Sequence, residues 1–159
     1  MDKENKLVPG LPSGFEDRWS NKLLLKKKLV KAIEKNFIKF GAEALETPSF
    51  EISENIGSFL AEDEANPMSD VFSFEDSDQS ITLRYDLSSP LARFYAQNNQ
   101  ELPSVFKRYQ IQNVFRNEKA GNGRYREFLQ ADFDIIGNVN PAQANAELCN
   151  LISSTLSEC

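Results

Sequence analysis

The chain has 159 residues, 40% of them apolar, which is enough to bury the core of one domain. Its formal charge of −6 and isoelectric point near 4.8 argue against a protein that coats nucleic acid, because a broad phosphate-binding surface needs an excess of Lys and Arg. With no histidine and only two cysteines, the composition disfavours a zinc site and excludes a nucleophile activated by histidine within this chain.

The hydropathy pattern bears on localisation. No apolar run approaches the roughly 18 residues of a membrane span, and the charged N-terminus lacks the apolar core of a secretory signal. We therefore expect a cytoplasmic protein.

The chain begins with a segment that we expect to form an arm. Residues 1–14 end in Val8 to Gly14, which holds two prolines and two glycines, and residues 15–159 should form one domain. The next segment, Asp17 to Phe40, predicts an amphipathic helix that ends at Gly41. Its lysine-rich face should meet solvent. Its apolar positions recur at helical spacing: Trp19, Leu23, Val30, Ile33, Phe37 and Phe40.

Short elements should follow this helix. Ala44 to Pro48 predicts a strand that Pro48 ends, because proline has no N–H for a ladder. Glu51 to Glu64 is typical of a short helix and a loop. Two alternating runs, Val71 to Phe74 and Ser80 to Tyr85, then predict a β-hairpin around an acidic turn.

A helix over Leu91 to Gln97 should follow the second run, with Ser89 as its N-cap and Pro90 in its first turn. Asp86 and Ser88 precede it and should share one face at the end of the strand. A carboxylate beside a hydroxyl can bind an ammonium group, so these two residues are candidates for a binding site, whereas Ser89 should be structural.

The most informative stretch is a long β-hairpin. Val105 to Phe115 and Phe128 to Ile136 are β-branched, apolar runs, and the polar loop Asn117 to Arg126 joins them. Arginine has a planar fork that suits phosphate oxygens. Three arginines gather at the loop end of this hairpin and favour a polyphosphate ligand: Arg116, Arg124 and Arg126.

Residues two apart share a face of a strand, so one row of side chains continues from the arginines along the second strand. An aromatic ring between cations and amides can stack on a nucleobase. The alternative is a charged sheet face that simply meets water, and composition and spacing leave both interpretations open. The row consists of Arg124, Arg126, Phe128, Gln130 and, further on, Asp134.

A final helix should begin after Asn140, which is a good N-cap, with Pro141 in its first turn. The predicted fold class is therefore α+β. We expect a mainly antiparallel sheet built from the hairpins, with helices packed on one face.

Several stretches resemble a known family. Phe115 to Glu118 resembles the F-R-x-E signature of motif 2 in class II aminoacyl-tRNA synthetases, and GRYREFLQ, Gly123 to Gln130, is similar to its continuation in histidyl-tRNA synthetases. TLRYDLSSPLARF, Thr82 to Phe94, resembles the stretch that binds the substrate amino group in that family. The Asp17 to Phe40 helix and Pro48 resemble motif 1, which implies a homodimer with Pro48 at its interface.

The resemblance covers roughly Val8 to the C-terminus and implies a partial class II catalytic core that activates histidine with ATP and transfers it to tRNA(His). Mg²⁺ would bridge the phosphates, with no metal site on the protein itself. By resemblance, Arg116 is catalytic and holds the α-phosphate. The other implied ATP-binding residues are Glu118, Arg124, Arg126 and Phe128; the implied amino-acid-binding residues are Asp86, Ser88, Gln130 and, for the imidazole, Asp134.

The family's motif 3, its histidine-specific segment and its anticodon-binding domain would lie beyond Cys159. We therefore expect the 159-residue chain alone to bind ATP weakly and to aminoacylate nothing. Two other interpretations stay open: the regulatory subunit of ATP phosphoribosyltransferase, a non-catalytic paralogue, and a stand-alone ATP-binding or dimerisation module. Such paralogues tend to lose the arginines, the aromatic and the acids that this chain keeps.

Overall fold

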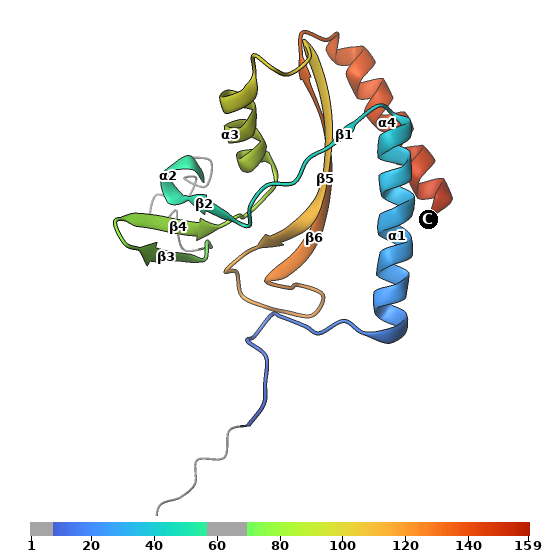
Figure 1. The fold of residues 1–159 in the computed structure, drawn as a ribbon. Coiled ribbons are helices and arrows are strands. Elements are labelled where there is room, and N and C mark those ends of the chain that lie inside the picture. The colour runs from blue at the N-terminus through green and yellow to red at the C-terminus, as the bar shows by residue number, and fades with distance from the viewer. Residues whose placement is uncertain (1–7, 57–69) are drawn as a thin grey trace, which may run out of the picture.

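The computed structural model describes residues 8–56 and 70–159 (Figure 1). The helices and strands, in chain order, are α1 (Ser20–Lys39), β1 (Glu43–Ala44), β2 (Phe50–Ile52), α2 (Ser53–Ile56), β3 (Ser73–Asp76), β4 (Gln79–Leu83), α3 (Ser88–Asn98), β5 (Val105–Phe115), β6 (Glu127–Gly137) and α4 (Pro141–Glu158). None of these helices is both long and apolar enough to cross a bilayer.

The long hairpin predicted from the sequence is confirmed as β5 and β6. Its antiparallel ladder runs without a break from Val105 opposite Gly137 to Phe115 opposite Glu127. Strand β1 adds to the other edge of β5 in parallel, with Ala44 opposite Tyr109. A second sheet, in the order β2-β4-β3, is antiparallel throughout. The α+β class is therefore confirmed, with one mixed and one antiparallel sheet.

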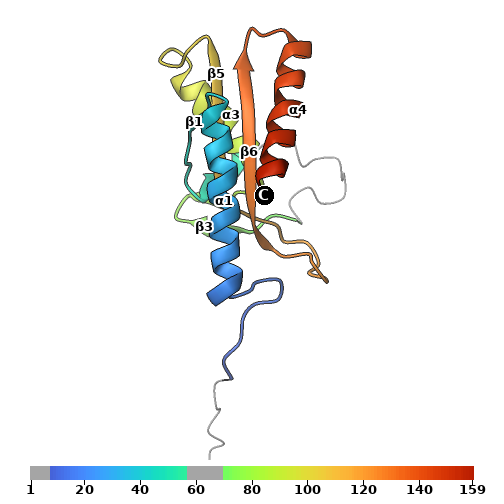
Figure 2. The same ribbon diagram turned by 90° about the vertical axis from the view of Figure 1, so that its right-hand side faces the viewer.

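One face of the hairpin carries the hydrophobic core. Because side chains alternate along a strand, Tyr109, Ile111 and Phe133 lie on the same side, which we call the apolar face. Phe37 of α1 packs against it, with ring centroids 5.8 Å from Tyr109 and 5.5 Å from Phe133. Leu151 of α4 completes the core, and α1 and α4 lie side by side over this face (Figure 2).

The opposite face of the hairpin is covered by α3 (Figure 1). The Phe94 ring of α3 lies 6.4 Å from that of Phe106 of β5, and the other side chains on this face are mostly polar. The prediction of helices on one face is therefore wrong, since α3 covers the second face. We call this side the polar face and define it by Arg108, Gln110 and Gln112 of β5 and Gln130, Asp132 and Asp134 of β6.

The predicted helix ends agree well with the structure. Helix α1 ends just before Gly41, whose φ of +81° belongs to the left-handed region that glycine adopts readily. The Asn140 side chain caps α4 by accepting from the Ala142 N–H at 2.9 Å. Trp19 does not belong to the buried stripe: it precedes α1 and is 78% exposed.

Four local predictions differ from the structure. The strand expected over Ala44 to Pro48 is limited to β1, Glu43–Ala44, the two residues that pair with β5. Residues 50–52, expected in part as helix, form β2 because Glu51 pairs opposite Thr82 of β4; residues 57–64 of the same prediction lie outside the described residues. The predicted acidic turn is shorter, since Asp76 and Gln79 still pair and only two residues turn the chain. Helix α3 begins earlier than predicted, and Asp86 rather than Ser89 bonds its first turn.

Candidate functional site

A cavity of about 290 Å³ lies where the loop after β5 meets the start of β6. It is lined by Arg116, Glu118, Gly123, Arg124, Tyr125 and Phe128. Four of the five residues predicted to bind ATP are therefore brought together here. Two guanidinium groups, one carboxylate and two aromatic rings make a small cavity with cationic and stacking character.

Arg116 is held between two aromatic rings. Its guanidinium carbon lies 4.4 Å from the centroid of Tyr85 and 5.0 Å from that of Phe128. Its Nε donates to the Tyr85 carbonyl at 3.5 Å. These contacts fix the direction of the guanidinium group, and Phe128 also lines the cavity.

Glu118 connects the two sides of the cavity. It accepts a hydrogen bond from the Tyr85 hydroxyl at 3.1 Å and forms an ion pair with Arg124. Burial raises the pKa of Tyr85; Arg116 opposes this effect, and Glu118 adds to it. The tyrosine therefore stays a neutral donor, which suits its hydrogen bond to the Glu118 carboxylate.

Arg126 does not line this cavity. Its Nε donates to the Glu118 carbonyl at 2.8 Å, and its guanidinium lies 5.9 Å from the Phe72 centroid. Its backbone N–H donates to the Gly14 carbonyl at 2.8 Å, and a Cβ on Gly14 would lie 2.7 Å from the Arg126 Cγ. Arg126 thus joins the N-terminal arm to the loop, and only glycine permits this close approach.

The two residues predicted to bind an ammonium group meet at a second, smaller cavity of about 120 Å³, which is lined by Asp86, Ser88, Ser89 and Ala92. They do not lie on a strand end as predicted, because β4 stops at Leu83 and Ser88 opens α3. Asp86 Oδ1 accepts from the Ser89 N–H at 3.1 Å, which fixes the carboxylate at the start of the helix.

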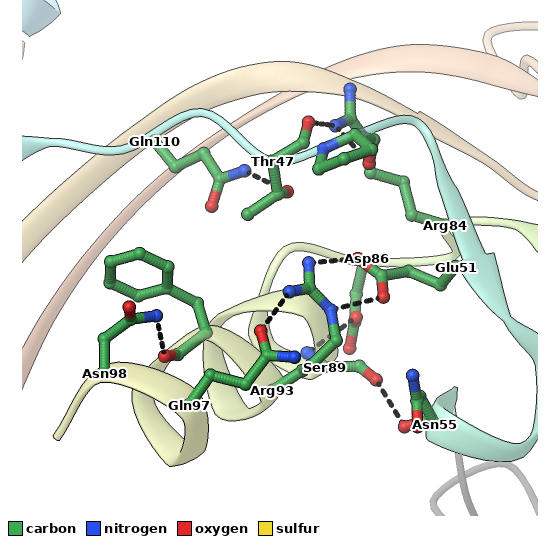
Figure 3. Close-up of polar contacts among 12 residues, drawn as sticks. Thr47, Glu51, Asn55, Arg84, Asp86, Ser89, Arg93, Gln97, Asn98 and Gln110 are labelled. Atoms are coloured by element: carbon green, nitrogen blue, oxygen red, sulfur yellow. Dashed lines mark hydrogen bonds and ion pairs between the residues drawn. The ribbon is translucent and has the colours of Figure 1, made fainter.

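Ion pairs and carbonyl contacts hold this region in place (Figure 3). Arg93 of α3 binds the buried Glu51 of β2 through Nε at 2.6 Å and Nη2 at 2.8 Å, and the hydrogen bonds to Glu51 raise the pKa of Arg93. Buried Arg84 donates to the carbonyls of Thr47 at 2.7 Å and Pro48 at 3.2 Å. Pro48, the predicted dimer contact, is itself exposed.

The polar face continues the site along β6. Gln130 Nε2 donates to Asp132 Oδ1 at 3.1 Å, and Asp134 Oδ2 lies 2.9 Å from Nη2 of Arg108. Burial raises the pKa of Asp134, and Arg108 opposes that rise. At about 3.4 Å per residue, Asp134 lies about 20 Å along the strand from Phe128, so a ligand spanning both would be elongated.

Tyr85 and the β5 half of the polar face were not predicted from the sequence. Arg108, Gln110 and Gln112 alternate with apolar residues, a pattern that usually marks a solvated strand face, whereas Arg108 and Gln110 are buried. Their register against Asp134 and Gln130 could have indicated a shared site. Among the residues that the structure describes, no group of three Asp, Glu, Cys or His side chains could hold a metal ion.

Comparisons with known proteins bear on the family and the fold rather than on single residues of the site. A family model described as "Histidyl-tRNA synthetase" matches residues 14–159. The chain is 77% identical to the histidine–tRNA ligase of Pelagibacter ubique over its whole length but covers only 34% of that protein. It therefore spans about a third of the length of this curated relative.

Two solved structures share the fold. The histidyl-tRNA synthetase of Nostoc sp. PCC 7120 matches with a TM-score of 0.78 and 26% identity, over 93% of this chain and 34% of that one. A Bacillus halodurans protein described as an ATP phosphoribosyltransferase regulatory subunit/histidyl-tRNA synthetase matches with a TM-score of 0.78 and 23% identity, over 99% of this chain and 39% of that one. At that identity, the second match shows the fold alone.

Proposed function

The chain belongs to the histidyl-tRNA synthetase family, and from this premise we propose that it supplies part of the catalytic core of a histidine–tRNA ligase. The reaction would be activation of histidine by ATP followed by transfer to tRNA(His). The observation that carries the proposal is the fixed guanidinium of Arg116, which faces a cavity shared with Glu118, Arg124 and Phe128.

The chemistry needs no nucleophile from the protein. The histidine carboxylate attacks the α-phosphorus of ATP, a new O–P bond forms, and the bond to the leaving pyrophosphate breaks. Catalysis is then a matter of positioning and of stabilising charge on the transferring phosphoryl group. Arg116 suits this role because its charge is held in one direction before the substrate arrives.

The other cavity residues would bind the rest of the nucleotide. Phe128 would stack on the adenine, and Glu118 would accept from the adenine amino group. Arg124 would exchange its ion pair with Glu118 for the outer phosphates. Mg²⁺ would arrive with the nucleotide as ATP·Mg²⁺ and neutralise phosphate charge. Arg126 would act indirectly, by holding the loop.

The amino acid would bind toward α3 and the polar face. Asp86, Ser88 and Gln130 would hold its ammonium group, and Asp134 would accept from the imidazole. The carboxylates are anchored, since Asp86 is bonded to the first turn of α3 and Asp134 to Arg108. Two fixed anions suit a substrate that carries one or two cationic groups.

The whole protein would work as a cytoplasmic homodimer with Pro48 at the interface. In support, Pro48 is exposed while its carbonyl is bound by the buried Arg84, so this part of the surface is firmly held. The regulatory-subunit alternative rests on a shared fold. It does not account for the chain keeping both the nucleotide and the amino-acid residues together.

Calorimetric titration of the purified chain with ATP·Mg²⁺, with and without histidine, tests the proposal. We expect Arg116→Ala to weaken ATP binding at least about tenfold, because charge-assisted hydrogen bonds to phosphate are lost. Lys35→Ala is the matched control: it removes an exposed cation of α1 that pairs with Glu158, away from the cavity. It should leave ATP affinity unchanged.

The outcomes separate the alternatives. Equal ATP affinities in the Arg116→Ala and Lys35→Ala variants would place the nucleotide elsewhere and contradict the proposal. Histidine binding without ATP binding would favour the regulatory paralogue. The full reaction can be tested by replacing the matching segment of the P. ubique ligase with this chain and measuring histidine-dependent exchange of pyrophosphate into ATP.

A further inference from the structure

Arg108 is the one strongly buried cation on the described part of the polar face, and the proposed reaction gives it no contact with a substrate. It lies in the middle of β5, directly opposite Asp134 in the ladder, and is 0% exposed. Burying a guanidinium is costly unless the group is paired and hydrogen-bonded. The contacts of Arg108 should therefore indicate its function.

One nitrogen of Arg108 connects the two halves of the proposed amino-acid site. Nη2 lies 2.9 Å from Asp134 Oδ2 on β6 and donates to the Leu87 carbonyl at 3.1 Å. Leu87 is the residue between Asp86 and Ser88 and is itself fully buried. The strand that carries Asp134 and the segment that carries Asp86 and Ser88 are thus joined through one side chain.

More carboxylates act on Arg108 than the one with which it forms an ion pair. Burial lowers the pKa of Arg108, while Asp134, Asp132 and Asp86 act in the opposite direction, so two carboxylates of β6 and one just before α3 act on the same guanidinium. Among the described residues, Arg108 Nε and Nη1 are buried without a hydrogen-bond partner, as is Oε1 of Gln130. Such a cluster has the polarity of a ligand site, because an ordinary core leaves few buried polar atoms unpaired.

We propose that Arg108 is a positioning residue that fixes the Asp134 carboxylate against the segment carrying Asp86 and Ser88, and so sets how strongly the site holds the histidine imidazole. This inference rests on the proposed function, since it concerns the amino-acid half of the same site. Arginine suits the task better than lysine because the two N–H groups of Nη2 lie in a fixed plane and can serve two acceptors in a set geometry.

A residue that only stabilises the fold would behave differently. Its loss would change the free energy of unfolding and would affect ATP and histidine binding together. Loss of a positioning residue should weaken histidine binding selectively and alter its pH dependence, because Arg108 opposes the rise in the pKa of Asp134 that burial causes. The charged groups that act on Asp134 are Arg108 from β5 and Asp132 from β6, and Asp86, just before α3, acts on Arg108 itself.

The experiment is calorimetric titration of the 159-residue chain with histidine and, separately, with ATP·Mg²⁺, from about pH 5 to about pH 8. The variants are Arg108→Met, which removes the charge, and Arg108→Lys, which keeps it without the fork. The matched control is Lys107→Met, which removes a cation one residue away on the opposite face, where it pairs with Glu147.

We expect Arg108→Met to weaken histidine binding about tenfold or more near neutral pH and Arg108→Lys to recover part of that loss, while ATP affinity stays within about twofold. In Arg108→Met the fall in histidine affinity toward acid should begin at higher pH, because the pKa of Asp134 rises further without the guanidinium. Titration of the histidine ligand itself is common to all variants and cancels in the comparison.

Thermal unfolding followed by circular dichroism shows which variants fold. If Arg108→Met does not fold, the Arg108→Lys variant decides: a parent-like affinity and a parent-like pH profile would overturn the inference. Equal effects of Arg108→Met and Lys107→Met on histidine affinity would overturn this inference but not the proposed function. Equal losses of ATP and histidine affinity in a folded variant would do the same. Failure of the parent chain to bind histidine would overturn the proposed amino-acid site and this inference with it.

Discussion

On the apolar face of the β5–β6 hairpin, Tyr109 and Phe133 pack against Phe37. Their neighbours in the two strands, Arg108 and Asp134, point to the polar face and form an ion pair there. Both faces belong to the same ladder and both are covered by helices. Among the residues that the structure describes, the apolar face has aromatic rings packed against one another. The polar face has buried side-chain atoms of Arg108, Gln110 and Gln130 that lack a hydrogen-bond partner.

This difference teaches that burial alone does not distinguish a core from a site. A sheet covered on both faces usually carries apolar residues on both, because buried polar groups are costly unless they are bonded. Here one covered face is polar and incompletely paired, at positions continuous with the cavity that Arg116 and Phe128 line. The apolar face should therefore account for stability and the polar face for binding, and three substitutions test that division.

Phe37→Ala should have the largest effect. Phe37 is 7% exposed and contacts rings on both strands, so its truncation should lower the free energy of unfolding by about 3–5 kcal/mol through lost contacts and a cavity. Urea denaturation measures this. The neighbouring Ile38→Ala is the control, because Ile38 is 57% exposed and should cost less than about 1 kcal/mol. Similar losses in both variants would contradict the assignment of the core.

Tyr85→Phe should have a smaller effect, on ATP affinity, at the cavity that Arg116 lines. The ring under Arg116 is kept, but the hydrogen bond to Glu118 is lost, which should cost about 1 kcal/mol of ATP binding energy, or about fivefold in affinity. Calorimetry with ATP·Mg²⁺ measures it. Tyr95→Phe, in α3 and outside both cavities, is the matched control. An equal loss of ATP affinity in the control would mean that Tyr85 does not contribute to the site.

Gln110→Met should have the smallest effect on stability, although Gln110 is fully buried. Its Nε2 donates to Thr47 Oγ1 at 2.8 Å and to Gln112 Oε1, which also accepts from the Thr47 N–H, but its Oε1 has no partner among the described residues. Loss of the two hydrogen bonds and removal of the unpaired oxygen should nearly cancel, leaving the free energy of unfolding within about 1 kcal/mol of the parent. Urea denaturation showing a loss as large as that of Phe37→Ala would mean that the polar face is part of the stabilising core.

The elements that the sequence predicted well are those with a clear period and a local stop signal. The α1 helix has its apolar stripe and Gly41, α4 has Asn140, and the long hairpin has two β-branched runs around a polar loop. Strand β2 could not be predicted, because its three residues are fixed by pairing with a distant strand rather than by their own pattern.

The site was predicted in part for the same physical reason. Arg116, Glu118, Arg124 and Phe128 meet as expected because they flank one short loop. Arg126 was placed in the same row by strand alternation, but β6 begins only at Glu127 and the backbone of Arg126 bonds to Gly14, so the alternation does not extend to it. Arg108 could be recognised only once the register set it opposite Asp134.

The pair of rings around Arg116 also affects the thermodynamics of binding. A free arginine side chain carries about 2 kcal/mol of rotamer entropy, much of which is lost when it grips a phosphate. In this fold Tyr85 and Phe128 already restrict that freedom before any nucleotide arrives. The ordering cost thus falls on folding rather than on binding, so the affinity of the cavity depends on the stability of the loop that closes it.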